Sequence, residues 1–349
     1  MLLLTLLDKK TIHKHVALAL QGGGAHGAFT WGVLDRLLEE ETIVADAMCG
    51  TSAGAINAVV CAYGLHKGGP AKAKELLEKL WKKLSDSGGF KPSAFDKYWS
   101  NGDIYNSPGY ILFNTMSQFM SPYNFNPLNY NPLRDILNDL VDFEDLHHYK
   151  GKKIFICATN VKTNRAKIFT NKEITVDAVM ASACLPFLFQ AVEVNGEYYW
   201  DGGYMGNPPI FPMITNTNLH DIVLIKINSI NIKSVPTTAR DIADRINEIS
   251  FNSSLINEMK LIHYRNELLR NGILKTDDKV NREIFIHTIS GYDTLGQMHY
   301  SSKMNTSWEF LLSLKQKGRD TADKWLQNEF KLVGAKSTFD VEEHFFEKF

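Results

Sequence analysis

The sequence HVALALQGGGAHG, residues 15–27, decides the fold class of this chain. Its first six residues form a short apolar run that ends at a glycine loop, a pattern typical of a buried strand. Beyond the loop, apolar side chains recur at helical spacing, namely Trp31, Leu34, Leu37 and Leu38. The loop therefore opens a helix, and the order strand, glycine loop, helix indicates an α/β fold.

The same order follows once more along the chain. An apolar run over residues 43–48 leads into CGTSAG, residues 49–54, and an alanine-rich helix is expected directly after it. Further buried strands are predicted over residues 153–159, 222–227 and 283–289. Strands that alternate with helices predict a mostly parallel sheet covered by helices.

Three further helices are predicted, over residues 176–184, 239–270 and 305–330. The second is long and amphipathic, with five apolar side chains near one face: Ile242, Ile246, Ile249, Ile256 and Met259. The chain contains no internal repeat and no low-complexity linker. We therefore expect a short N-terminal segment (1–14), one core (15–215), and an α/β and helical extension packed on that core (216–349).

Residues 85–132 differ from the rest because they are crowded with Gly, Pro, Asn and aromatic residues. The only helical pattern there is a short one over residues 110–119. A long loop of this kind is usually functional or disordered, and its aromatic residues argue against disorder. We interpret it as a lid over the core; the alternative is a packed insertion with no role in binding.

Composition excludes several classes of protein. The 349 residues carry 38 Lys and Arg against 39 Asp and Glu, so a protein that grips nucleic acid is not expected. The apolar opening MLLLTLL is too short to span a membrane and lacks the features of a signal peptide. Four cysteines without C-x-x-C spacing favour buried thiols in a reducing compartment. A cytoplasmic protein is expected, although a local patch can still bind a lipid surface.

Residues 50–54, GTSAG, have the form G-x-S-x-G. Between a strand and a helix this spacing makes a nucleophile elbow, in which small residues on either side allow Ser52 to occupy a strained turn. The free N–H groups of the following helix help to stabilise negative charge at that point. The alternative interpretation is a glycine turn whose serine only caps the helix.

Residues 22–27, GGGAHG, fit G-x-G-x-x-G, and two functions compete for this loop. In a dinucleotide-binding fold the glycines allow the pyrophosphate to approach the helix, and an acidic residue ends the next strand. In an acyl hydrolase the same backbone amides form an oxyanion hole. The second strand ends in Met48 and Cys49, which disfavours a dinucleotide, but Asp46 within it keeps that alternative open.

A serine nucleophile needs a base. The late histidines His220, His263, His287 and His299 stand in no sequence context that marks them. Asp201, in contrast, lies in WDGG, a glycine-bordered loop from which a carboxylate can point into a shared cleft. A carboxylate within hydrogen-bond reach can serve as general base. The alternative is that Asp201 only organises its own turn.

Three motifs occur in order: GGGAHG at residues 22–27, GTSAG at residues 50–54 and DGG at residues 201–203. Together they resemble the patatin-like phospholipase family, over roughly residues 15–214. The resemblance implies a three-layer α/β/α sandwich that is related to, but distinct from, the α/β-hydrolases. It also implies catalysis by a Ser–Asp dyad without histidine.

Carried to this sequence, the resemblance implies that Ser52 is the nucleophile and Asp201 its base. The backbone amides of Gly23, Gly24 and Ala25 would form the oxyanion hole. The other motif residues would support these groups: Gly22, His26, Gly27, Gly50, Gly54, Gly202 and Gly203. Family members often carry Arg or Lys where this chain has His26, and a neutral imidazole brings less positive charge to a phosphate-bearing substrate.

The function implied is hydrolysis of lipid carboxylic esters, phospholipid or lysophospholipid, through an acyl-enzyme and without metal or other cofactor. The expected partners are the lipid ester and, at the periphery, a membrane interface. Three residues are candidates for substrate contact: Pro186, Phe113 and Phe119. Pro186 is equally explained as an ordinary helix stop. The alternatives are an acyltransferase on the same dyad, or a non-catalytic protein that binds acyl chains or a partner.

Overall fold

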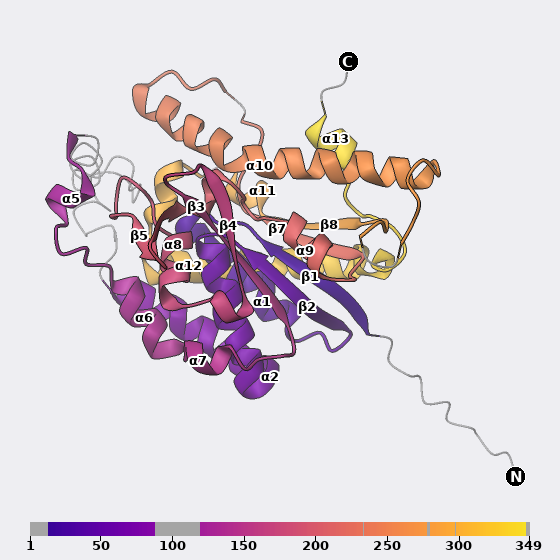
Figure 1. Ribbon diagram of the computed structural model, residues 1–349, viewed down its shortest axis with the longest axis horizontal. Helices are drawn as coiled ribbons and strands as arrows, with labels where there is room; N and C mark the ends of the chain where they lie inside the picture. The colour runs from indigo at the N-terminus through magenta and orange to yellow at the C-terminus, as the bar shows by residue number, and fades with distance from the viewer. Residues whose placement is uncertain (1–12, 88–118, 233, 278–279, 297, 347–349) are drawn as a thin grey trace, which may run out of the picture.

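The computed structural model of the chain describes residues 13–87, 119–232, 234–277, 280–296 and 298–346 (Figure 1). Most of the sheet is parallel: β3, β2, β1, β7 and β8 lie side by side in that order. On the β3 side the sheet continues with antiparallel β6 and β5, and β4 also pairs with β3 in antiparallel orientation. The strands are β1 (Lys14–Leu20), β2 (Ile43–Gly50), β3 (Lys153–Asn160), β4 (Arg165–Thr170), β5 (Val192–Val194), β6 (Glu197–Asp201), β7 (Asp221–Lys226) and β8 (Phe285–Ser290).

Helices cover both faces of this sheet. Successive residues of β1 alternate between two hydrophobic clusters, with Leu18 and Leu20 in one and Ala17 and Ala19 in the other. The first cluster contains side chains of α1 (Gly27–Leu37), α2 (Ala53–Asp86), α6 (Pro132–Leu140), α8 (Val176–Ser182) and α12 (Trp308–Asn328). The second contains side chains of α9 (Phe211–Asn216), α10 (Ala239–Arg270) and α13 (Val341–Phe345). The predicted three-layer α/β/α sandwich is confirmed.

Short helices complete the described chain. The α-helices among them are α5 (Pro122–Phe125), α7 (Phe143–Leu146) and α11 (Tyr292–Leu295). The 3₁₀ helices are η1 (Gly24–His26), η3 (Asn171–Glu173), η4 (Gly202–Tyr204), η5 (Tyr300–Met304) and η6 (Phe330–Leu332). Two of them, η1 and η4, carry the glycine motifs of the sequence. No helix in these ranges is both long and apolar enough to cross a membrane.

The antiparallel strands β4, β5 and β6 were not expected from the sequence. Strands β5 and β6 form a hairpin whose two connecting residues, Asn195 and Gly196, both have positive φ. Asn-Gly between two short strands is a strong hairpin signal. The consequence concerns Asp201, which is the last residue of β6 and not part of a free loop.

The amphipathic helix predicted over residues 239–270 is α10 (Ala239–Arg270). In its second half the apolar face is buried on the sheet, as Met259 shows. In the first half that face is open, because Ile242, Ile246 and Ile249 are between 43% and 58% exposed. Figure 1 shows this half rising away from the strands, so the expected continuous buried face exists only over the second half.

The proposed lid falls largely outside the described residues. Residues 88–118, which include Phe113 and nearly all of the helix candidate over 110–119, are not described, and neither are residues 1–12. The end of the insertion contains α5, and Phe119 before it is 83% exposed. The role of the insertion as a lid therefore stays a prediction.

Candidate active site

Ser52 occupies the turn between β2 and α2, at the carboxyl end of the parallel strands. Its φ of 55° and ψ of −125° are strained for a residue with a side chain. Two glycines make the turn possible. A Cβ on Gly50 would lie 2.5 Å from the backbone of Gly54, and a Cβ on Gly54 would lie 2.1 Å from the carbonyl oxygen of Leu20. This is the geometry of the elbow that the sequence predicts.

The turn is also held from outside. The backbone N–H of Ser52 donates to the Oγ atom of Ser182, the last residue of α8, at 3.0 Å. That serine stands in no motif, so sequence reasoning did not find it. Its hydroxyl fixes the direction of the peptide before the nucleophile.

Asp201 reaches the same region from the other side of β3. The antiparallel pairing of β6 with β3 sets Asp201 opposite Ala158, and β3 lies next to β2, which leads to Ser52. The Asp201 side chain is completely buried. Its Oδ1 accepts the backbone N–H of Gly203 at 2.7 Å, while Oδ2 has no hydrogen bond of regular geometry. The structure thus brings the two predicted residues together across three strands.

Burial raises the pKa of the Asp201 carboxyl to about 7. Hydrogen bonding from the Gly203 N–H offsets part of this rise, and the Ser52 hydroxyl adds to the offset as a weak donor. A carboxylate with a pKa near 7 is a stronger base than an ordinary aspartate at neutral pH. Its burial therefore gives Asp201 the property that a general base needs.

The glycine loop packs directly against the nucleophile. A Cβ on Gly22 would lie 2.8 Å from the Cβ of Ser52, and Gly24 has a φ of +58°. Within the described ranges, the N–H groups of Gly23, Gly24 and Ala25 have no hydrogen-bond acceptor. Free amides beside a serine hydroxyl are able to stabilise a developing oxyanion.

Three polar side chains outside the motifs hold this loop in place. The N–H of Gly22 donates to Asn207 Oδ1 at 2.6 Å, and Asn228 Nδ2 donates to the Gly22 carbonyl at 2.7 Å. Gln21 Oε1 accepts the N–H groups of Ile227 and Asn228. Two of these residues, Asn207 and Asn228, are far from the loop in sequence, so no local pattern could identify them.

Close packing also explains the other motif glycines. A Cβ on Gly27 would lie 2.7 Å from the Cβ of Ala53. A Cβ on Gly202 would lie 2.1 Å from the carbonyl oxygen of Cys157, and one on Gly203 would lie 2.1 Å from the ring of Phe251 on α10. These glycines allow the glycine loop, the elbow and the Asp201 turn to meet one another and α10.

His26 is neutral and 2% exposed. Burial, followed by the charge of Lys303, lowers its pKa to about 3. Its Nε2 lies 2.7 Å from Ser302 Oγ, and that hydroxyl donates its proton to the carbonyl of His299 at 2.6 Å. The Nε2 of His26 must then carry the proton, which leaves Nδ1 as an acceptor. Among the described residues, no partner contacts the buried Nδ1.

Of the three residues predicted to contact the substrate, Pro186 alone is placed near the dyad by the described structure. The N–H of Asp201 donates to the Cys184 carbonyl at 2.8 Å, so the loop that contains Pro186 runs beside the base. Phe119 is exposed in the segment before α5, with no contact to the dyad shown. Phe113 lies outside the described residues.

Two alternatives from the sequence, His287 as the base and Asp46 as a ribose-binding carboxylate, are not supported by the positions of these residues. His287 Nε2 lies 2.9 Å from Asp221 Oδ1, but Asp221 begins β7, at the opposite end of the sheet from the elbow. Asp46 likewise pairs with His15 near the start of β1 and with Lys152. It is therefore remote from the glycine loop, where a ribose-binding carboxylate would be needed.

Comparison with known proteins gives a consistent result. A family model described as patatin-like phospholipase matches residues 18–214, more than half of the chain. Among curated proteins, the uncharacterized protein YjjU of Escherichia coli (strain K12) is 26% identical over 199 residues, 56% of this chain and 47% of that protein. The cGAMP-activated phospholipase of Escherichia coli (strain TW11681) is 26% identical over 220 residues, 56% of this chain and 53% of that protein.

Lysophospholipase NTE1 of Cryptococcus neoformans is also 26% identical, over 240 residues, 69% of this chain and 12% of that protein. The chain thus spans about half the length of two of these relatives and a small part of the third. Among solved structures, VipD from Legionella pneumophila is similar with a TM-score of 0.40 and 16% identity, over 90% of this chain and 67% of that one. ExoU of Pseudomonas aeruginosa, in complex with SpcU, has a TM-score of 0.33 and 16% identity, over 91% of this chain and 54% of that one.

Proposed function

Because the chain belongs to the patatin-like phospholipase family, we propose that it is a serine acyl hydrolase that cleaves carboxylic esters of lipids through Ser52 and Asp201. One observation carries the proposal: a completely buried carboxyl group, with its pKa raised to about 7, lies beside the hydroxyl of a serine in a strained elbow. Burying an ionisable carboxyl group destabilises its charged form, and carboxyl groups with pKa values shifted in this way are typical of active sites.

In the first step, Ser52 Oγ forms a bond to the acyl carbonyl carbon while the Asp201 carboxylate accepts the serine proton. The free amides of the glycine loop stabilise the negative charge that develops on the carbonyl oxygen. The bond to the leaving alcohol then breaks, and Asp201 returns the proton to the alcohol oxygen. The product that remains is an acyl ester on Ser52.

In the second step, a water molecule attacks the acyl carbonyl as Asp201 takes one of its protons. The oxyanion is held at the same amides. When the bond to Ser52 breaks, Asp201 gives the proton back to Oγ and a fatty acid leaves. The carboxylate alternates between base and acid, so the proposal needs no histidine.

The proposed substrate class is phospholipid or lysophospholipid. Family membership supports it, as do the relatives named as a lysophospholipase and a phospholipase. Such substrates reside in membranes or micelles, so the proposal includes peripheral contact with a lipid interface.

Two measurements test the dyad. A fluorophosphonate probe should label the wild-type protein and fail to label Ser52→Ala, because only an activated serine hydroxyl reacts with it. A hydrolysis screen over lipid classes should show fatty acid release that Ser52→Ala abolishes. The matched control is Ser250→Ala on α10, whose hydroxyl donates to the Ile246 carbonyl within its own helix. Equal release by Ser52→Ala and wild type would disprove the proposal.

A further inference from the structure

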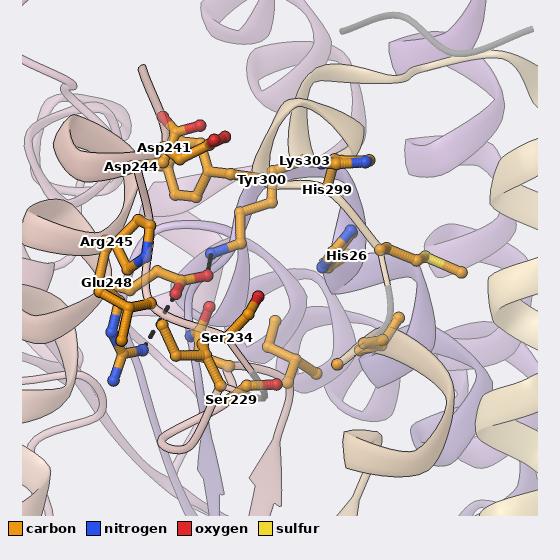
Figure 2. A pocket seen from close by; sticks show the side chains of 18 of the residues that line it. His26, Ser229, Ser234, Asp241, Asp244, Arg245, Glu248, His299, Tyr300 and Lys303 are labelled. Atoms are coloured by element: carbon orange, nitrogen blue, oxygen red, sulfur yellow. Dashed lines mark hydrogen bonds and ion pairs between the residues drawn. The ribbon is translucent and has the colours of Figure 1, made fainter. Parts of the chain in front are cut away.

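A cavity of about 610 Å³ opens on the other side of the glycine loop, within the size range typical of small-molecule sites. Figure 2 shows how it is built: side chains of α10 stand on one side, those of η5 on the other, and His26 closes its edge. Its floor is formed by the three residues that come directly after β7 in the chain, Ile227, Asn228 and Ser229. Of the three sequence motifs, the glycine loop reaches this cavity through His26.

The cavity borders the proposed catalytic groups. A Cβ on Gly24 would lie 2.4 Å from the carbonyl oxygen of Lys303, and a Cβ on Gly23 would lie 2.9 Å from the side chain of Ile227. Both of these neighbours line the cavity. Tyr300, another lining residue, has its pKa raised by burial first and then by nearby acidic groups, among them Asp201. The glycine loop is therefore the wall between this cavity and Ser52.

Lys303 supplies a cation whose ion pair with Glu248 is long. Its side chain is 14% exposed, and the nearest carboxylate oxygen, Glu248 Oε1, is 4.0 Å from Nζ. That carboxylate is closer to Arg245, at 3.2 Å. The Lys303 ammonium lies 4.4 Å from the centre of the Tyr300 ring, and its pKa is lowered to about 8 by burial. A mostly protonated amine in this position is suited to bind an anionic group.

Asp244 supplies the opposite charge. Among the described residues its carboxylate forms neither a hydrogen bond nor an ion pair, although its neighbour Asp241 accepts from Thr238. Burial raises the pKa of Asp244 to about 6, with further contributions from Asp241 and Glu248. The charges of Lys303 and Arg240 offset part of this rise, and the group is still mostly ionised at pH 7.

His26 adds an independent sign that a ligand is missing. It lines the cavity, it is buried, and its Nδ1 acceptor has no partner among the residues that the structure describes. A buried polar atom without a hydrogen bond is costly unless a ligand or water satisfies it. The free glycerol hydroxyl of a lysophospholipid would supply the donor that Nδ1 lacks.

We propose that this cavity binds the head group of a zwitterionic lipid, with the phosphate at Lys303 and the ammonium at Asp244. The glycerol part of the same lipid then lies along His26 and the glycine loop, with its ester directed to Ser52. This assignment rests on the proposed hydrolase function and adds to it the class of head group. A separated cation and anion in one cavity match a phosphate and an ammonium joined by a short linker.

Direct binding tests the cavity without catalysis. Titration calorimetry on the full chain would compare glycerophosphoethanolamine with glycerol 3-phosphate, ethanolamine and inorganic phosphate. The zwitterion should bind at least tenfold more tightly than each of the others. Asp244→Asn should weaken its binding by about tenfold, to the level of glycerol 3-phosphate. Inorganic phosphate that binds as tightly as the zwitterion would overturn the assignment.

Variants of Lys303 separate charge from packing. Lys303→Met should lose about tenfold in affinity for the zwitterion, and Lys303→Arg should keep most of it because the positive charge remains. Asp320→Asn on α12 is the matched control for Asp244→Asn, since it removes one carboxylate charge that does not line the cavity, and it should bind like the wild type. Unchanged affinity in both Asp244→Asn and Lys303→Met would refute the proposal.

Kinetics distinguish this inference from the hydrolase proposal. The ratio of kcat/KM for phosphatidylethanolamine to that for a diacylglycerol, in micelles of one detergent, should fall about tenfold in Asp244→Asn and stay constant in Asp320→Asn. Hydrolysis of both lipids without any head-group preference would overturn the cavity assignment alone. Head-group binding without any hydrolysis would overturn the hydrolase proposal while supporting the binding site.

Discussion

The Oδ1 atom of Asp201 accepts the backbone N–H of Gly203 at 2.7 Å, whereas Oδ2 has no hydrogen-bond partner among the described residues. The hydrogen bond fixes the orientation of a completely buried carboxyl group. The turn that follows β6 therefore does two things for the proposed base: it orients the carboxyl group, and it holds that group in a site where its charge is poorly solvated.

The first prediction concerns pH. Because the pKa of Asp201 is raised to about 7, the carboxyl is mostly protonated at pH 6 and cannot accept the Ser52 proton. The kcat/KM for a short soluble ester should rise about tenfold per pH unit below pH 7 and level off above pH 8. Initial rates between pH 5 and 9 measure this profile. An inflection near pH 4, where an ordinary aspartate titrates, would contradict the assignment.

The second prediction is that Asp201→Asn stabilises the fold while it abolishes activity. The pKa of Asp201 is raised above its ordinary value of 3.8 to about 7, so the folded state binds the proton more tightly than the unfolded state. Its contribution to stability is complete below about pH 4 and is lost as pH rises through 7. Asparagine carries no charge and can still accept the Gly203 N–H.

Thermal and urea unfolding of the wild type and of Asp201→Asn measure whether the variant is the more stable protein. At pH 8 the variant should be more stable by about 1–4 kcal/mol, and the difference should shrink as the pH falls and nearly vanish below about pH 4. Hydrolysis should fall by at least about 10³-fold at every pH, because the base is gone. A variant less stable than wild type at pH 8 would show that the ionised carboxylate stabilises the folded protein, which would contradict the raised pKa proposed for Asp201.

A third prediction addresses the contact between the glycine loop and the nucleophile. In Gly22→Ala the new Cβ would lie 2.6 Å from the Thr51 carbonyl oxygen and 2.8 Å from the Ser52 Cβ, so the loop must shift. We expect turnover to fall by about 10²-fold, comparable to the loss of one oxyanion donor. The control is Gly69→Ala, where a positive φ adds strain but no atom lies within 4 Å. That variant should lose about 1–2 kcal/mol of stability and no activity.

The fourth prediction concerns Ser182, which accepts the N–H of Ser52 at 3.0 Å. Ser182→Ala leaves that amide without its partner and loosens the elbow. The expected result is a drop in kcat of about tenfold with KM nearly constant, since the serine is misplaced and substrate contacts persist. The pH profile should not move, because Ser182 does not titrate. Ser313→Ala on α12, which removes an exposed hydroxyl bonded within its own helix, serves as control.

The parallel part of the fold was predictable because its signals are local. Each parallel strand is a short run of apolar residues, and the elbow and glycine loop follow two of them directly. The limits of α10 agree with the prediction over residues 239–270 because Thr238 caps its start and the apolar spacing persists. These features depend on neighbours in sequence.

The rest of the site depends on neighbours in space. Asn207 and Asn228 hold Gly22, yet they stand 185 and 206 residues further along the chain. The position of Asp201 follows from the pairing of β6 with β3, which the sequence analysis missed despite the Asn-Gly turn. Most residues that line the cavity between α10 and η5 come from the C-terminal part of the chain and stand in no motif, so the sequence did not predict the cavity.

The pairing of β7 with β1 has a consequence for anyone who shortens this protein. The family model ends at residue 214, before β7, but β7 forms hydrogen bonds along the side of β1 that faces away from β2. A fragment cut at that boundary would present a bare, apolar strand edge, which invites association with other copies. Such a fragment should precipitate or form aggregates on expression, and any chain meant for crystallisation or assay must retain β7 and β8.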